Sequence, residues 1–305
     1  MADHAHAHAP RPLGGGLLTP FTLLLGVLSA IAGVILLYRF FYGLGAVTNL
    51  NDGYPWGIWI AYDVVVGSAF ACGGYAMALL VYIFNKGQYH PLVRPALLAS
   101  LFGYTLAGAS VIFDLGRWWN FWHIFWPGYA QVNSVMFEVA VCISAYIVVM
   151  WIEFSPAFLE KLGMKDVRQK LNKLLFFFIA LGVLLPSMHQ SSLGSLLVIF
   201  GQQIHPLWQS GWMLPVIYLM TAILLGFAVV IFEATLSSTG FNRPLETQVL
   251  TPLSKIMFWL LAAYVVLRVL DLVFRGALGG AFAASWQAFW FWVEMAAFVV
   301  PLVLL

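Results

Sequence analysis

The sequence contains few charged residues. Asp, Glu, Lys and Arg make up 9% of its 305 residues, whereas about 25% is usual in a soluble domain. Hydrophobic residues account for 62% of the chain, and the mean hydropathy is +0.91. We therefore predict an all-α integral membrane protein that crosses the bilayer several times, since helices satisfy their own backbone hydrogen bonds in lipid. The net charge of +2 is too small to indicate nucleic-acid binding.

Cysteine is also scarce. Cys72 and Cys142 lie in different apolar stretches without CxxC spacing, which excludes an iron–sulfur cluster held by this chain alone and covalently attached c-type haem. The seven histidines include no pair near the middle of a predicted span that could bind haem from both sides. We therefore expect neither haem nor an iron–sulfur cluster in this chain, so any electrons would come from a partner.

The first twenty residues lack the apolar segment and the cleavage site of a signal peptide. His4, His6 and His8 could bind a metal adventitiously, but a solvated tail is the simpler interpretation, and we predict no metal site. We predict a disordered cytoplasmic tail at residues 1–20 and a transmembrane helical bundle at residues 21–305. Because the last apolar stretch reaches the final residue without a polar stop, we expect the native protein to continue.

Eight apolar stretches are long enough to cross a bilayer, which takes about 20 helical residues. Cytoplasmic connections carry an excess of Lys and Arg. Ten of the 14 Lys and Arg lie in the N-terminal tail and in or beside the connections after spans two, four and six, so we place the N-terminus in the cytoplasm. The predicted spans are residues 21–42, 57–84, 94–116, 133–153, 173–192, 212–236, 254–275 and 285–305.

The connections on the opposite, outward side are long and rich in aromatic residues. The connection after span three reads RWWNFWHIFWPGYAQ. Aromatic residues in such loops commonly anchor the interface with lipid. They also suit a docking surface for a partner protein, because they offer a large apolar contact area. The sequence leaves both interpretations open.

Three carboxylates, those of Asp63, Glu138 and Glu294, lie inside apolar spans with no oppositely charged residue one helical turn away. Intramembrane carboxylates usually face a cavity and lie on paths of ions, protons or substrates. A structural carboxyl group bonded to a neighbouring helix is the alternative. His189 follows Pro186 in LLPSMHQSSLGS, and we expect Pro186 to break span five and leave His189 at the membrane edge.

Two pairs of opposite charge lie near outward helix ends, Asp114 with Arg117 and Arg268 with Asp271. The members of each pair are three residues apart, so each pair is either a local ion pair or part of a site.

Two further acids, Glu153 and Glu233, lie near the inward ends of spans four and six. Tyr104 lies about midway along span three, where its hydroxyl group could link the inward and outward levels by hydrogen bonding. A proton relay and chance placement at helix ends both stay open for these acids.

Several segments resemble those of a known family: GYPWGIWIAYDVVVGSAFACGGYAMA, FNKGQYHPLVRPALLASLFGY, NSVMFEVAVC, LPSMHQSSLGS and HPLWQS. They are similar to the integral membrane subunit of hydrogenase-2-type nickel–iron hydrogenases, within the wider polysulfide-reductase and NrfD-like family of membrane anchors. The resemblance runs from about residue 13 to the C-terminus. It implies eight core helices, with two more in the hydrogenase branch.

The resemblance also implies a function in anaerobic respiration, at the periplasmic side of a bacterial inner membrane. Large and small hydrogenase subunits would oxidise hydrogen, and a ferredoxin-like iron–sulfur subunit would pass electrons to menaquinone or another quinone. This chain would bind the quinone and move protons, and would not be catalytic alone. By this resemblance, Glu138, Tyr104, Glu153 and Glu233 transfer protons. The candidates for the quinone pocket are Asp63, Asp114, Arg117, His189, Arg268 and Asp271.

Two other functions are compatible with the sequence. A secondary transporter also carries acids and Pro-broken helices within the membrane, although the acids here gather toward one face rather than at the midplane. A passive anchor for another oxidoreductase of this family would need only the docking loops.

Overall fold

The computed structural model describes residues 18–51, 53, 60–240 and 244–305. Within these ranges, eight helices are long and apolar enough to cross a membrane. The predicted fold class, an all-α polytopic membrane protein, is therefore confirmed. The predicted tail lies mostly outside the described residues, and the division at residue 20 stays a prediction.

Seven spans are continuous α-helices, and the second is a composite of short helical segments. The continuous helices are α1 (Pro20–Tyr42), α5 (His90–Asp114), α6 (Val135–Lys161), α7 (Lys165–Ile199), α8 (Leu214–Gly240), α9 (Thr247–Phe274) and α10 (Trp286–Leu304). The second span combines π-helical η2 (Ala61–Gly67), α3 (Ser68–Phe70), α4 (Gly73–Ala78) and π-helical η3 (Leu79–Ile83). Short 3₁₀ turns in the connections are η1 (Leu44–Ala46), η4 (Gly87–Tyr89), η5 (Trp118–Phe125), η6 (Gly201–Gln203), η7 (Gly211–Met213) and η8 (Leu278–Phe282).

The second span packs at the centre of the bundle because its residues are small. In its most apolar 18-residue stretch, 56% of the residues are buried, a larger share than in the other seven spans described. A Cβ atom added to Gly226 of α8 would lie 2.6 Å from the carbonyl oxygen of Cys72. On the other side, the Gly74 N–H donates to Ser100 Oγ of α5 at 2.6 Å. Small residues allow such close approach of membrane helices, and they bring the backbone of this span against both α5 and α8.

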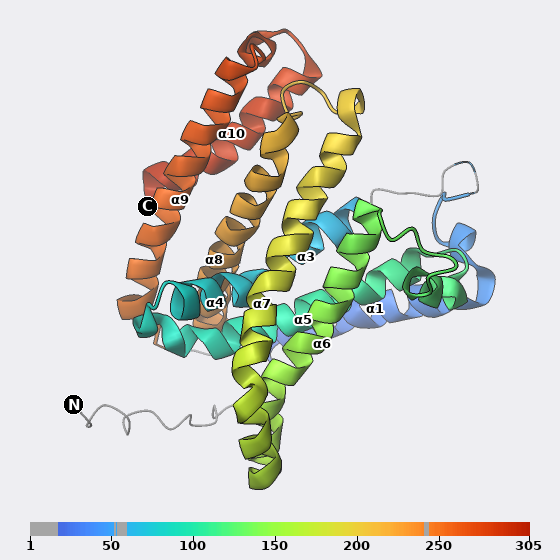
Figure 1. The fold of residues 1–305 in the computed structure, drawn as a ribbon, viewed down its shortest axis with the longest axis vertical. Coiled ribbons are helices and arrows are strands. Elements are labelled where there is room, and N and C mark those ends of the chain that lie inside the picture. The colour runs from blue at the N-terminus through green and yellow to red at the C-terminus, as the bar shows by residue number, and fades with distance from the viewer. Residues whose placement is uncertain (1–17, 52, 54–59, 241–243) are drawn as a thin grey trace.

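The helices α6 and α7 form a long antiparallel pair joined by a short turn (Figure 1). The α7 helix has 35 residues and begins well before the predicted span, because its first turns carry charged residues that a count of apolar residues omits. Our expectation that Pro186 breaks this helix is wrong, since α7 continues past it. A proline inside a helix removes one backbone hydrogen bond, and membrane helices tolerate this where neighbouring helices pack around it; Pro186 is buried. His189 therefore lies inside α7 rather than at its end.

The α1 helix lies at the edge of the bundle, and no residue in its most apolar 18-residue stretch is buried. Arg39, near its C-terminal end, is the exception at 2% exposure. Its Nε donates to the carbonyl oxygen of Phe113 at 2.7 Å, and its Nη2 donates to that of Leu115. The last carbonyl groups of a helix lack intrahelical partners, so Arg39 caps the C-terminal end of α5.

Of the remaining helices, α8 packs against α7, α9 packs against α8, and α10 packs against α9 (Figure 1). The connections that follow α7 and α9 lie at the same end of the bundle, opposite the α6–α7 turn. Arg275 Nη1 donates to the carbonyl oxygen of Pro206 at 2.8 Å and ties these two connections together. Successive connections therefore alternate between the two ends of the bundle, as expected for a chain that crosses the membrane repeatedly.

Candidate functional site

Glu138 lies in the first turn of α6 and is half-buried. Its Oε1 accepts a hydrogen bond of 2.9 Å from Ser192 Oγ of α7. A carboxylate in the first helical turn also faces the positive end of the helix dipole, which stabilises a negative charge by about 0.3 to 1 kcal/mol. Both contacts reduce the cost of a charged group at this depth, and both leave the second carboxylate oxygen available to a ligand.

His189, on the same face of α7 as Ser192, is fully buried. Its Nδ1 lies 3.0 Å from the carbonyl oxygen of Leu185, and its Nε2 lies 2.9 Å from the hydroxyl oxygen of Tyr104. Because a carbonyl group can only accept, Nδ1 carries the proton in a neutral ring. Nε2 is then the acceptor, and the hydroxyl group of Tyr104 donates to it. The structure thus joins two predicted site residues from α5 and α7.

Gln190 and Cys72 surround this pair with further polar contacts. Gln190 Nε2 lies 3.1 Å from Ser68 Oγ and 3.2 Å from His189 Nε2. Cys72 Sγ lies 3.3 Å from the hydroxyl oxygen of Tyr104. Gln190 Oε1 is buried without a hydrogen-bond partner, and a buried amide oxygen without a partner is costly. We call Ser68, Cys72, Tyr104, His189 and Gln190 the buried polar cluster.

Tyr146 of α6 packs against the buried polar cluster and lies in sequence between the two acids of its own helix, and it was not predicted from the sequence. Its ring is 1% exposed, and its centroid lies 4.8 Å from that of Tyr104 and 6.3 Å from that of His189. It lies eight residues after Glu138 and seven before Glu153, intervals that keep all three on one face of a helix. The sequence could have indicated Tyr146 as a site residue through this spacing.

Glu153 lies against α7 at the level of Gly182, further from the membrane edge that holds Glu138. A Cβ atom added to Gly182 would lie only 2.5 Å from Glu153 Oε1. The carboxylate therefore occupies the space that the missing side chain leaves between the two helices. Small residues commonly make such room between membrane helices.

We expect replacement of Gly182 with Ala to displace the Glu153 carboxylate. A helical Gly→Ala change gains about 1 kcal/mol in propensity, and the clash should cancel this gain, since overpacking costs roughly 1 to 3 kcal/mol. In a Glu153→Ala background the clash disappears, and Gly182→Ala should then stabilise by about 1 kcal/mol. Unfolding in detergent measures all three variants.

The control is Gly33→Ala in α1, where an added Cβ atom has no heavy atom within 4 Å. It should show the full gain of about 1 kcal/mol in both backgrounds. If Gly182→Ala gains as much as the control while Glu153 is present, the carboxylate does not depend on this space.

Of the two possibilities left open for Asp114 and Arg117, the local ion pair is not formed. Arg117 is exposed, and no ion pair among the described residues joins it to Asp114. Asp114 instead lies beside the carboxylate of Asp63 and near the guanidinium group of Arg39, and its Oδ2 is buried without a hydrogen-bond partner. The arginine that compensates these acids therefore comes from α1, and sequence proximity pointed to the wrong one.

The predicted pair of Arg268 with Asp271 is formed, at 3.6 Å. It belongs to a larger network, because Asp271 Oδ2 also accepts from Arg275 Nη2 at 2.6 Å and from Ser210 Oγ at 2.7 Å. Arg268 Nη2 donates to the carbonyl oxygen of Leu207 at 2.7 Å. We call Leu207, Ser210, Arg268, Asp271, Arg275 and Glu294 the outward charged network.

Glu294 of α10 is a structural carboxylate of this network. It accepts from Trp208 Nε1 at 2.5 Å and from the hydroxyl group of Tyr264 at 3.1 Å, and it lies 3.8 Å from Arg268 Nε. This is the alternative that the sequence left open for an acid without a partner in its own helix. No hydrogen bond or ion pair within the described ranges joins this network to Glu138.

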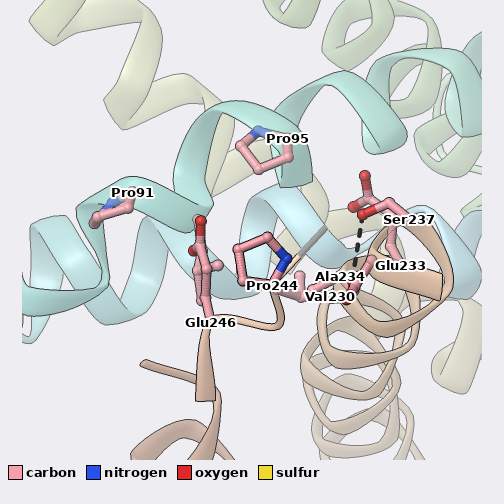
Figure 2. A pocket seen from close by; sticks show the side chains of 10 residues that line it. Pro91, Pro95, Val230, Glu233, Ala234, Ser237, Pro244 and Glu246 are labelled. Atoms are coloured by element: carbon pink, nitrogen blue, oxygen red, sulfur yellow. Dashed lines mark hydrogen bonds between the residues drawn. The ribbon is translucent and has the colours of Figure 1, made fainter. Parts of the chain in front are cut away.

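Glu233 lies apart from the other predicted proton-transfer residues. It lines a small pocket between the first turns of α5, the end of α8 and the segment before α9 (Figure 2). Within the described ranges, no hydrogen bond or ion pair connects it to Glu153 or to the buried polar cluster. The predicted site residues thus fall into separate groups, and Glu138, Tyr104, His189 and Glu153 gather along the seam between α6 and α7 and the neighbouring face of α5.

Comparison with known proteins gives the family. Residues 46–305 match the family model described as polysulphide reductase, NrfD. The chain belongs to this family. The resemblance seen in the sequence is confirmed, and the NrfD match covers all of the spans after the first.

Three relatives show the range of this NrfD chain's similarity. It is 50% identical over 98% of its length to the probable Ni/Fe-hydrogenase 2 b-type cytochrome subunit of Escherichia coli, covering 77% of that protein. It is 28% identical over 75% of its length to the menaquinone reductase integral membrane subunit of Nitratidesulfovibrio vulgaris, covering 56% of that protein. It is 32% identical over 35% of its length to a selenate reductase subunit of Mesobacillus selenatarsenatis, covering 24% of that protein.

The name of the Escherichia coli relative corrects one prediction. A b-type cytochrome binds haem, so the expectation that this chain holds no haem is wrong on this comparison. The described histidines, however, do not fit a haem held between two imidazole rings. His189 is the buried one among them, and both its ring nitrogens lie within hydrogen-bonding distance of other groups. We therefore assign no haem ligands and derive no step through haem.

Proposed function

We propose that this NrfD chain is the quinone-reactive membrane subunit of a nickel–iron hydrogenase complex on the periplasmic side of a bacterial inner membrane. The large and small hydrogenase subunits oxidise hydrogen, and a ferredoxin-like iron–sulfur subunit passes the electrons to menaquinone or a related quinone. The chain binds the quinone and supplies protons, with its N-terminus in the cytoplasm. It is not catalytic alone.

The names of two relatives support a quinone-linked redox role. One is called a hydrogenase subunit and the other a menaquinone reductase subunit. The third relative is named for selenate reductase, so the family model by itself does not select the partner. The hydrogenase assignment rests on 50% identity along nearly the whole chain.

The observation that carries the proposal is the hydrogen bond of Glu138 to Ser192, which lies one turn of α7 from His189 of the buried polar cluster. Reduction of a quinone to a quinol takes two electrons and two protons, so the headgroup needs a proton donor within hydrogen-bond reach. Glu138 has one carboxylate oxygen held by Ser192 and can present the other to a ligand. His189 and Tyr104, already joined by a hydrogen bond, form the next polar step inward.

The source of Glu138's protons is part of the proposal. Tyr146 and Glu153 continue the same face of α6 toward its other end, which supports a relay along the α6–α7 seam. Glu233 lies outside this seam, so its proposed role in proton transfer rests on the family resemblance alone. Asp63, Asp114, Arg117, Arg268 and Asp271 stay candidates for shaping the outward side of the quinone pocket.

Purification in mild detergent tests the function. We expect iron–sulfur and hydrogenase subunits to copurify with the chain, and the complex to reduce a menaquinone analogue with hydrogen in liposomes. Removal of the chain should abolish quinone reduction and leave hydrogen-driven reduction of a soluble dye intact. Solute transport by the purified chain alone, or copurification with the subunits of a different oxidoreductase, would contradict the proposal. An absorption spectrum of the same preparation measures its haem content.

A further inference from the structure

The end of the bundle that holds the α8–α9 connection contains two adjoining hollows, which share Glu233 and no other residue with the proposed quinone chemistry. The first is a polar pocket with a cavity volume of about 130 Å³. Figure 2 shows that its walls come from three segments, with Pro91 and Pro95 on α5, Glu233 and Ser237 on α8, and Glu246 in the chain that leads into α9.

The second hollow is an apolar groove of about 450 Å³ between α3, α5 and α8. Nine of its ten lining residues are apolar, and the tenth is Glu233, which also lines the polar pocket. Ala71, Ala99 and Gly103 are small and make the groove deep, while Phe232 stands 65% exposed at its edge. The two hollows therefore meet at one carboxylate, one being polar and the other apolar.

We propose that the two hollows together bind one phospholipid with an ammonium headgroup, of the phosphatidylethanolamine type, from the leaflet at this end of the bundle. One acyl chain lies in the apolar groove, where burial of hydrocarbon is favourable. The ammonium group lies in the polar pocket between the carboxylates of Glu233 and Glu246. Such charge-assisted hydrogen bonds are among the stronger polar contacts.

The charges of the pocket select this headgroup. Glu233 and Glu246 are its two charged groups, and the described lining residues include neither Lys nor Arg. Both classes of phospholipid carry a phosphate, but an anionic lipid has no cation to set against the two carboxylates and is repelled by them. A quinone headgroup is uncharged and likewise offers no cation to this pair. An ammonium group supplies three donors and a positive charge. The lipid site does not rest on the proposed function, because it involves no redox partner and shares only Glu233 with the proposed proton path.

Native mass spectrometry of the purified, delipidated protein tests the proposal with three probes, dioleoyl phosphatidylethanolamine, dioleoyl phosphatidylglycerol and menaquinone. We expect one tightly retained ethanolamine lipid and about tenfold weaker retention of the glycerol lipid. Replacement of Glu246 with Lys should reverse this preference. Replacement of Ala99 with Phe should fill the groove and lower retention of both lipids by about tenfold.

Two matched controls carry the same changes elsewhere. Ala30→Phe places the ring on the exposed face of α1, and Glu160→Lys reverses an exposed charge at the end of α6; neither should alter lipid retention. Glu246 is exposed, so its variant keeps the experiment decisive if Ala99→Phe fails to fold. Equal retention of both lipids by the wild type and the Glu246→Lys variant would overturn the proposal. So would tight binding of menaquinone that Ala99→Phe abolishes.

Discussion

Replacement of Glu138 with Gln is expected to lower hydrogen-driven reduction of a menaquinone analogue by about 100-fold, since a positioned proton donor contributes roughly 10² to 10⁴ in rate. Gln has the same shape and can still accept the hydrogen bond that Ser192 donates at 2.9 Å. It cannot release a proton to the quinone. The loss should therefore appear in quinone reduction, measured in liposomes that contain the whole complex.

Two internal measurements make this result specific. Hydrogen-driven reduction of a soluble dye by the same preparation should stay unchanged, because the dye takes electrons from the partner subunits directly. The amount of copurified partner subunits reports assembly. The control variant is Glu160→Gln, which removes an exposed carboxylate of the same helix that pairs with Arg168 at 3.3 Å and should leave all rates unchanged. Normal quinone reduction by an assembled Glu138→Gln complex would remove Glu138 from the proton path.

The number and approximate positions of the spans could be predicted from sequence because hydropathy over about 20 residues is a local property. The ends of α6 and α7 could not, since both helices extend into charged segments beyond the apolar stretch. The passage of α7 through Pro186 also could not be predicted, because Pro186 is buried and the helix is held there by tertiary packing. The composite second span depends on close contacts with two other helices, as at Gly226. Such tertiary contacts cannot be predicted from a short stretch of sequence.

The candidate site was predictable where one residue is unusual by itself. A carboxylate inside an apolar membrane helix has a high free-energy cost, so its presence indicates a function, and Glu138 was identified in this way. Partners that depend on the register of two helices were not found, and Ser192 of α7, which bonds Glu138 of α6, is an example. The compensation of Asp114 by Arg39 rather than by Arg117 has the same cause, because the packing of α1 against the end of α5 is a tertiary contact.

Replacement of Asp271 with Ala is expected to destabilise the protein by about 3 to 5 kcal/mol, the usual cost of removing one partner from a buried ion pair. Asp271 is 8% exposed and accepts from Arg275 at 2.6 Å and from Ser210 at 2.7 Å, with Arg268 at 3.6 Å. Without it, Arg268 is left 2% exposed with Glu294 at 3.8 Å as its nearest acid. Unfolding in detergent, followed by thermal or chemical denaturation, measures the loss.

The same variant separates two roles for the outward charged network. Arg268 and Arg275 donate to the carbonyl oxygens of Leu207 and Pro206, so the network fixes the connection between α7 and α8. If this is its role, Asp271→Ala should loosen that connection to proteolysis, and quinone reduction per assembled complex should stay near the wild-type value. If Asp271 belongs to the quinone pocket, the apparent KM for the quinone should rise even in the folded fraction. The control Glu160→Ala removes an exposed pair and should cost no more than about 1 kcal/mol, so a similar loss in both variants would contradict a buried network that stabilises the fold.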